Sequence, residues 1–285
     1  MHRLFLTGLA CLCLGLTARA EGPALWTFSD DDTTVHLFGS IHLMKPGVDW
    51  YVDEVKEAFE ASETLVVEAN VLEADPQVLQ QKTIELGLFQ GDDKLSNYVS
   101  EETMAKLVEA FGGTRAQIEQ FRPWFASIQL VNVLAARAGF RPDLGIDAVL
   151  LEKAVAQDMS IRALESLDYQ LNLLASIGDT EQAEALELSL EQYDDVNALF
   201  DEMSTDWLEE DTQGLDAVLL QPARDETPEL FEAIFTNRNQ TWVDPITALL
   251  EVPGTHFVVV GAGHLVGEDS VVDLLEQRGV DLTMD

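Results

Sequence analysis

Two histidines, one near each end of the chain, lie in the same short sequence context. Residues 39–43 read GSIHL and residues 261–265 read GAGHL, and both segments follow an apolar, β-rich run. Glycine lets the backbone turn sharply at a strand end and approach a bound molecule closely. Because ligands of open α/β sheets bind at the carboxyl ends of strands, the repeat predicts that His42 and His264 face a ligand. Three glycines are expected to lie against the substrate: Gly39, Gly261 and Gly263.

A carboxylate completes this set. Glu68 directly follows the apolar run Leu65-Val66-Val67, where a charge is costly unless it is paired, hydrogen-bonded or bound to metal. Two imidazoles and one carboxylate form a common ligand set for a divalent metal with positions left open for water. Such a metal generates hydroxide near neutral pH and polarises a carbonyl. The residue types therefore predict a hydrolytic metal site made by His42, Glu68 and His264.

Structural roles compete with this interpretation. A single Gly-x-x-His is more often a hydrogen-bonding structural feature, and Glu68 alone is as readily a salt-bridged carboxylate as a ligand. Two copies, each after a buried strand, favour the functional reading. The other internal histidines, His36 within a strand and His256 at a strand start, are expected to be structural.

The elements that would position these side chains follow from hydrophobic periodicity. Helical spacing dominates from about residue 75 to 250, and the Gly-Ile-Asp of residues 145–147 begins one of these helices. We therefore expect an α/β fold: a central mixed sheet built from both ends of the chain, flanked by helices, with a large helical insertion. The predicted strands are residues 25–28, 34–38, 64–67, 160–164, 255–260 and 280–284.

The first twenty residues have the layout of a cleavable signal peptide. Arg3 precedes an apolar run from Leu4 to Leu16, and small residues stand before a cut expected after Ala20. Both cysteines, Cys11 and Cys13, lie in this segment. We expect residues 21–285 to form a single periplasmic or secreted domain without disulfides and without a stable membrane anchor.

The net charge of the chain limits the classes of partner that it can bind. The sequence has 52 Asp and Glu against 16 Lys and Arg, which gives a formal net charge of −36. Such a surface repels nucleic acid and anionic membranes, since both are bound through Lys and Arg. The charge itself favours solubility and salt tolerance over a specific cationic partner. A peptide or small-molecule substrate is expected from the resemblance described next, and the oligomeric state stays open.

The paired glycine–histidine segments with Glu68 between them resemble the TraB/GumN family, which includes PrgY-type pheromone-shutdown proteins and the animal Tiki proteases. The likeness covers roughly residues 24–284. Further motifs carry it: Arg122-Pro123-Trp124-Phe125, Gly145-Ile146-Asp147, Leu164-Glu165 with Gln170, Arg238-Asn239 with Trp242, and residues 261–267.

The resemblance implies a fold similar to erythromycin esterases and haem-binding ChaN proteins, and peptide hydrolysis that depends on manganese or cobalt. The ligand set of two histidines and a glutamate also suits zinc. The resemblance adds Arg238 to the site, as a clamp for a carboxylate or an oxyanion, with Asn239 beside it and Glu165 in support. The acidic residue that often precedes this arginine is Asn237 here, so the chain departs from the family pattern at that point.

Three functions follow as expectations. The first is an exported metal-dependent hydrolase, chiefly a peptidase, with Glu68 as ligand or general base. The second is an esterase-like hydrolase without metal, in which a histidine serves as the general base. The third is a protein that binds a peptide, haem or metal without turnover.

Overall fold

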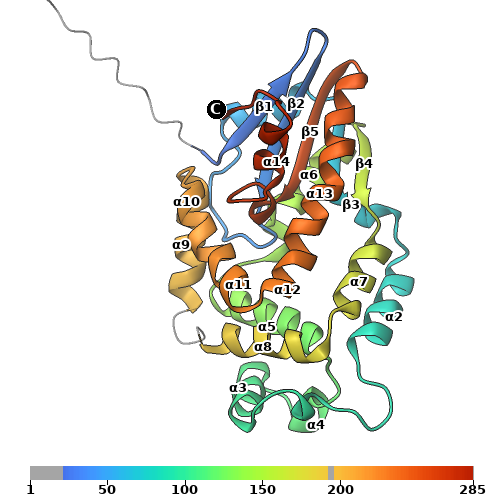
Figure 1. The fold of residues 1–285 in the computed structure, drawn as a ribbon, viewed down its shortest axis with the longest axis vertical. Coiled ribbons are helices and arrows are strands. Elements are labelled where there is room, and N and C mark those ends of the chain that lie inside the picture. Colours follow the sequence, from blue (N-terminus) through green and yellow to red (C-terminus); the bar gives the residue numbers. More distant parts are fainter. Residues whose placement is uncertain (1–21, 192–195, 285) are drawn as a thin grey trace, which may run out of the picture.

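A six-stranded mixed sheet forms the centre of the molecule (Figure 1). The computed structural model describes residues 22–191 and 196–284. The strands lie in the order β4-β3-β5-β2-β1-β6. Their bounds are β1 Leu25–Ser29, β2 Thr33–Ser40, β3 Thr64–Ala69, β4 Ser160–Glu165, β5 Gly254–Gly261 and β6 Thr283–Met284.

The two ends of the chain meet in the middle of this sheet. β1 and β2 form an antiparallel hairpin, and Asp30 in its turn accepts hydrogen bonds from the N–H groups of Asp32 and Thr33. β2 then pairs in parallel with β5, with Ser40 opposite Gly261. β5 also pairs in parallel with β3, which pairs in parallel with β4. The carboxyl ends of these four strands therefore share one edge.

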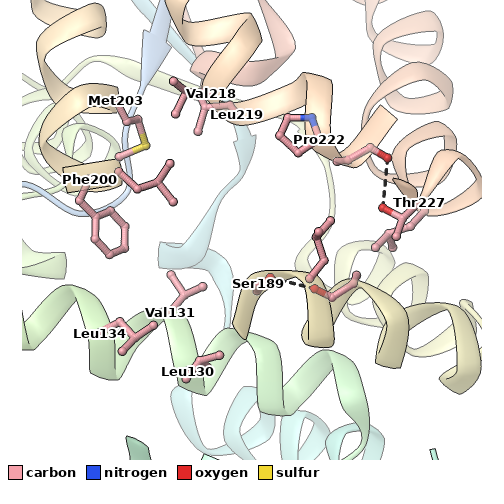
Figure 2. A pocket seen from close by; sticks show the side chains of 15 residues that line it. Leu130, Val131, Leu134, Ser189, Phe200, Met203, Val218, Leu219, Pro222 and Thr227 are labelled. Atoms are coloured by element: carbon pink, nitrogen blue, oxygen red, sulfur yellow. Dashed lines mark hydrogen bonds between the residues drawn. The ribbon is translucent and has the colours of Figure 1, made fainter. Parts of the chain in front are cut away.

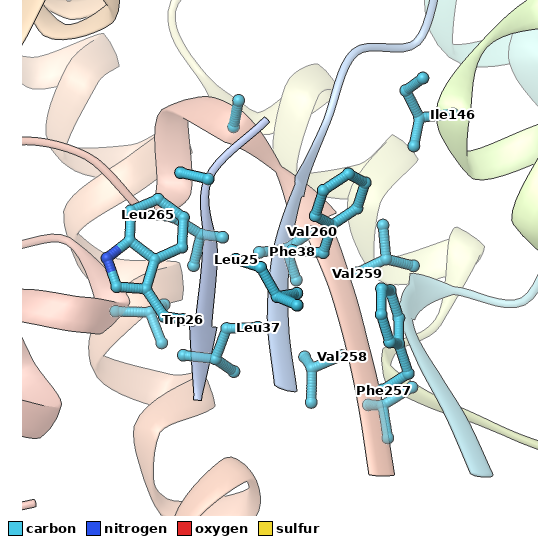
Figure 3. Close-up of a cluster of buried hydrophobic side chains, with 14 of the residues drawn as sticks. Leu25, Trp26, Leu37, Phe38, Ile146, Phe257, Val258, Val259, Val260 and Leu265 are labelled. Atoms are coloured by element: carbon cyan, nitrogen blue, oxygen red, sulfur yellow. The ribbon is translucent and has the colours of Figure 1, made fainter. Parts of the chain in front are cut away.

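The central strand β5 is apolar because it is covered on both faces. Phe257, Val258, Val259 and Val260 are fully buried, as expected for a parallel strand between two layers. Figure 3 shows these side chains beside Phe38 of β2. The rings of Phe38 and Phe257 are 5.7 Å apart between centroids, so aromatic packing helps to hold the two strands together.

Helices cover the sheet and extend beyond its carboxyl edge (Figure 1). The α-helices are α1 Asp53–Ala61, α2 Pro76–Gly87, α3 Glu101–Phe111, α4 Arg115–Ile118, α5 Pro123–Arg137, α6 Ile146–Ala156, α7 Leu167–Ser176, α8 Asp179–Glu191, α9 Val196–Leu208, α10 Thr212–Leu215, α11 Gln221–Glu226, α12 Pro228–Phe231, α13 Asn237–Thr247 and α14 Val271–Gln277. Two π-helices, η5 Asp216–Leu220 and η6 Glu232–Thr236, join this set. Short 3₁₀ turns are η1 Val71–Glu73, η2 Leu95–Asn97, η3 Pro142–Leu144, η7 Ala248–Glu251 and η8 Ala262–His264.

The helices far from the sheet have a hydrophobic core of their own. It joins α3, α5 and α8 through buried side chains such as Leu107, Leu130 and Leu186. α5 begins at Pro123, whose missing N–H costs nothing in the first turn of a helix. This packing makes the helical part a structural layer rather than a set of surface loops.

The α/β class and the mixed sheet built from both ends of the chain are confirmed. The last strand is shorter than predicted, because only Thr283 and Met284 pair, with β1. No helix in the described ranges is long and apolar enough to cross a membrane. The predicted signal peptide lies outside the described residues.

Candidate active site

His42 and His264 follow the carboxyl ends of neighbouring parallel strands. Because Ser40 lies opposite Gly261 in the β2–β5 pair, the two glycine–histidine segments leave the sheet side by side. Both histidines line one cavity of about 310 Å³ with Glu68 and Arg238. A Cβ added to Gly261 would lie 3.3 Å from Glu68 Oε1 and 4.0 Å from His42 Nε2. A side chain at position 261 would therefore crowd Glu68 and occupy space between the two groups.

His42 is oriented by a carboxylate. Its Nδ1 is 2.7 Å from Asp147 Oδ2, and Ser40 Oγ donates a 2.7 Å hydrogen bond to Asp147 Oδ1. Since Nδ1–H points at Asp147, Nε2 faces the cavity, and the side chain is 69% exposed. The hydrogen bond and charge of Asp147 raise the pKa of His42 to about 9.

Asp147 reaches His42 because α6 begins against the segment after β2. Ile146 N–H donates to the carbonyl of Ile41, and a Cβ at Gly145 would lie 2.1 Å from the carbonyl oxygen of His42. Only glycine permits this approach. Asp147 lies in the first turn of α6, where the helix dipole favours a negative charge. Although burial raises the pKa of Asp147, His42 keeps it below its ordinary value.

Both carboxylate oxygens of Glu68 accept hydrogen bonds. Oε1 accepts from Gly261 N–H at 2.7 Å, while Oε2 accepts from Arg238 Nη2 at 2.7 Å and from Gln170 Nε2 at 3.2 Å. Burial raises its pKa, but the positive charge and N–H donors around it outweigh burial and keep the pKa below the ordinary value. Glu68 is therefore an ionised carboxylate.

Arg238 is the centre of the buried charge network. Its side chain is 8% exposed and pairs with Glu68 and Glu165. Nη1 also lies 3.1 Å from His264 Nε2. The guanidinium packs over Trp242, whose Nε1 donates to Glu165 Oε1 at 2.9 Å. Two carboxylates thus neutralise and orient one cation beside the cavity.

His264 is a neutral ring with both nitrogens engaged. Nδ1 lies 2.6 Å from Asn239 Oδ1, and Asn239 Nδ2 donates to the carbonyl of Asp269, which fixes the orientation of the amide. Nδ1 therefore carries the hydrogen, and Nε2 accepts from Arg238. Burial, together with the charge of Arg238, lowers the pKa of His264 to about 3.

This arrangement does not fit a shared metal ion. A metal ligand needs a free lone pair on the imidazole, yet Nε2 of His264 is directed at Arg238. The guanidinium bridges Glu68 and His264, so manganese, cobalt or zinc bound by all three predicted ligands would require Arg238 to move. Within residues 22–191 and 196–284, no three His, Cys, Asp or Glu side chains are grouped to hold an ion.

The other predicted residues have distinct positions. Gly263 lines the cavity, whereas a Cβ at Gly39 would meet Ala262 Cα at 3.0 Å, so Gly39 serves close packing. Asn239 and Glu165 do not line the 310 Å³ cavity. Instead, Asn239 is hydrogen-bonded to His264, and Glu165 forms an ion pair with Arg238.

Three residues were missed by sequence reasoning: Ser40, Asp147 and Gln170. Asp147 and Gln170 stand in motifs that carry the resemblance, but without a role. For Asp147, the sequence offered one signal, a carboxylate directly after the start of a predicted helix. Asp147 and Gln170 also line a second cavity of about 280 Å³, which shares His42 and Glu68 with the first. His42 and Glu68 therefore lie between the two cavities.

Comparison with known proteins agrees with the resemblance. The model of the TraB/PrgY/gumN family matches residues 24–284. The uncharacterized protein YbaP of Escherichia coli (strain K12) is 26% identical over 243 residues, 84% of this chain and 87% of its own length. An uncharacterized protein of Treponema pallidum (strain Nichols) is 22% identical over 269 residues, 89% of this chain and 80% of its own. No solved structure matches, so the likeness to erythromycin esterases and ChaN stays a prediction.

Proposed function

The chain belongs to the TraB/PrgY/gumN family, and from this premise we propose that it is a hydrolase in which His42 activates water without a metal. The observation that carries the proposal is the His42–Asp147 pair, which leaves Nε2 facing a cavity that Arg238 also lines. A carboxylate on Nδ1 fixes the tautomer and stabilises the imidazolium that forms when Nε2 takes a proton.

The reaction is hydrolysis of an ester or amide. Water between His42 Nε2 and the substrate carbonyl attacks the carbonyl carbon, and Nε2 accepts the proton that the water loses. The positive charge of Arg238 favours the oxyanion of the tetrahedral intermediate. When the bond to the leaving group breaks, His42 returns the proton to the leaving oxygen or nitrogen. Glu68 and Glu165 keep Arg238 in position throughout.

A metal-dependent peptidase is the second candidate. One observation favours it: His42, Glu68 and His264 line the same cavity. The two mechanisms differ in their response to chelators. Activity that survives EDTA supports the first, and activity that EDTA abolishes and manganese or cobalt restores supports the second.

The test uses purified protein with p-nitrophenyl esters and a peptide library. We expect hydrolysis in EDTA that is lost in His42→Asn and retained in His36→Asn, which replaces a histidine hydrogen-bonded to Thr27 instead. Equal turnover by the wild type and His42→Asn would reject the proposal. If the wild type shows no turnover with or without metal, binding without catalysis remains, and a Soret band on haem titration would support that third function.

Export belongs to this proposal as an expectation from the sequence. Residues 1–20 carry the signal-peptide pattern, so the protein should accumulate outside the cytoplasm with Glu21 as its first residue. Fractionation followed by N-terminal sequencing would test this. Recovery of the intact chain in the cytoplasm would contradict it.

A further inference from the structure

A large apolar cavity lies among the helices beyond the candidate active site. Its volume is about 360 Å³. Figure 2 shows side chains from α5, α9 and the region of η5 and α11 facing a common space. Leu130, Val131 and Leu134 come from α5, and Phe200 and Met203 from α9. None of the fifteen residues that line it is charged, although the chain contains 52 Asp and Glu.

This cavity adjoins the one that contains His42. Met203 and Leu219 line both. The π-helix η5 lies at this boundary, because it supplies Val218 and Leu219 to the apolar cavity and Leu219 and Leu220 to the His42 cavity. The second π-helix, η6, lines the His42 cavity through Ile234 and Phe235. π-helical turns occur frequently at functional sites. A molecule with its carbonyl near His42 therefore has an apolar space next to it.

The lining selects against a peptide backbone. Each peptide unit brings an N–H and a C=O that must find partners when buried. The two hydroxyl groups in the lining already donate to helix carbonyls: Ser189 to Ala185 and Thr227 to Ala223. A hydrocarbon chain needs no such partners, and its burial is favourable in proportion to its apolar area.

We propose that this cavity holds the hydrocarbon tail of the substrate, so that the enzyme hydrolyses acyl esters or amides. The inference rests on the proposed hydrolytic function and adds the substrate class. A volume of about 360 Å³ accommodates a tail of about ten carbons if each methylene needs the ~30 Å³ that a water molecule takes in the liquid. The acyl carbonyl then lies near His42, and the tail passes Met203 and Leu219.

The first experiment compares chain lengths. p-Nitrophenyl acetate and decanoate are assayed below the concentration at which micelles form. We expect kcat/KM to be roughly tenfold or more higher for decanoate, because its tail fills the apolar cavity. A kcat/KM that is equal for both esters, or higher for acetate, would overturn the proposal.

A matched pair of variants tests the location. Val131 and Ile128 both lie on α5 and are 42% and 40% exposed, but only Val131 lines the cavity. Val131→Glu should lower kcat/KM for decanoate roughly tenfold more than kcat/KM for acetate, because a carboxylate disfavours an apolar tail. Ile128→Glu should change neither ester. Equal effects of both substitutions on decanoate would overturn the location.

A binding measurement separates this inference from the proposed catalysis. Decanoic acid serves as the probe: its binding to the wild type, His42→Ala, Val131→Glu and Ile128→Glu is measured by isothermal titration calorimetry, with thermal unfolding as a check on folding. We expect loss of binding only in Val131→Glu. Binding without turnover would reject the hydrolase and keep the tail site, whereas turnover of acetate without probe binding in the wild type would reject the tail site and keep the hydrolase.

Discussion

His42 and His264 occupy equivalent positions after parallel strands but have opposite electrostatic surroundings. His42 Nδ1 lies 2.7 Å from the carboxylate of Asp147, whereas His264 Nε2 lies 3.1 Å from the guanidinium of Arg238. The pKa of His42 is consequently raised to about 9, and that of His264 is lowered to about 3. The His42 ring therefore gains and loses its proton near pH 9, whereas the His264 ring stays a neutral acceptor above about pH 3. This difference separates an acid–base role from a positioning role.

The pH dependence of hydrolysis should follow His42. A general base must be unprotonated, and its folded-state pKa is about 9, so kcat/KM should rise roughly tenfold per pH unit from pH 7 and level off near pH 9. The measurement is a pH–rate profile from which the rate of His42→Ala is subtracted. A profile that is flat between pH 7 and 9 would contradict the role of His42 as the base.

Asp147→Asn should lower kcat roughly 10²–10⁴-fold, because the amide no longer fixes the tautomer of His42. It should also move the limb of the pH–rate profile toward neutral pH, since the hydrogen bond and charge of Asp147 are what raise the pKa of His42. Asp143→Asn is the matched control: Asp143 pairs with Arg141 at the surface. A profile of Asp147→Asn that keeps its original position would contradict the assigned pair.

Stability below neutral pH should depend on His264. Its pKa is about 3 when folded and about 6.5 when unfolded, so the unfolded state binds the extra proton between these values. The contribution is complete above about pH 6.5 and is lost as pH falls, by up to about 1.4 kcal/mol per unit. Denaturant unfolding of the wild type and His264→Gln between pH 6.5 and 4.5 should show the steeper loss in the wild type. Equal slopes would contradict a neutral buried His264.

Arg238→Gln should destabilise the protein by about 3–5 kcal/mol, because Glu68 and Glu165 then lack their buried cation. It also frees Nε2 of His264, so manganese or cobalt should raise the Tm of this variant more than that of the wild type. Arg141→Gln, at a surface ion pair, is the control. A larger metal-induced rise in the wild type would mean that Arg238 does not compete with metal.

Gly145→Ala should lower activity, although Gly145 lines neither of the two cavities that contain His42. The new Cβ would lie 2.1 Å from the carbonyl oxygen of His42, so α6 and Asp147 must shift, at a cost of about 1–3 kcal/mol. Activity should fall more than for Gly113→Ala, where the new Cβ would meet only Gln117 Oε1 at 3.5 Å. Thermal unfolding and kcat measure the two effects. A fully active Gly145→Ala variant would show that the His42–Asp147 geometry tolerates displacement.

The sequence by itself located the six strands, although the last of them is shorter than its apolar run. Alternating and continuous apolar runs locate the strands, because their periodicity follows from which faces are buried. The repeated Gly-x-x-His after two apolar runs identified His42 and His264, although the reason for glycine at position 39 is tertiary, a close approach to Ala262. Glu68 was found for another reason: a charge directly after the apolar run of residues 65–67 is costly unless it has a partner, and the structure places it within β3.

Only the tertiary structure decided which groups meet. The pairing of β2 with β5 depends on packing across the whole chain, so the closeness of His42 and His264 could not be derived from either segment. The partner of each ring could not be derived from the sequence around it either, because Asp147 lies on α6 and Arg238 lies on α13. The protonation of an imidazole is set by the charges and hydrogen bonds that surround it in space. The histidines of two similar motifs therefore have different pKa values.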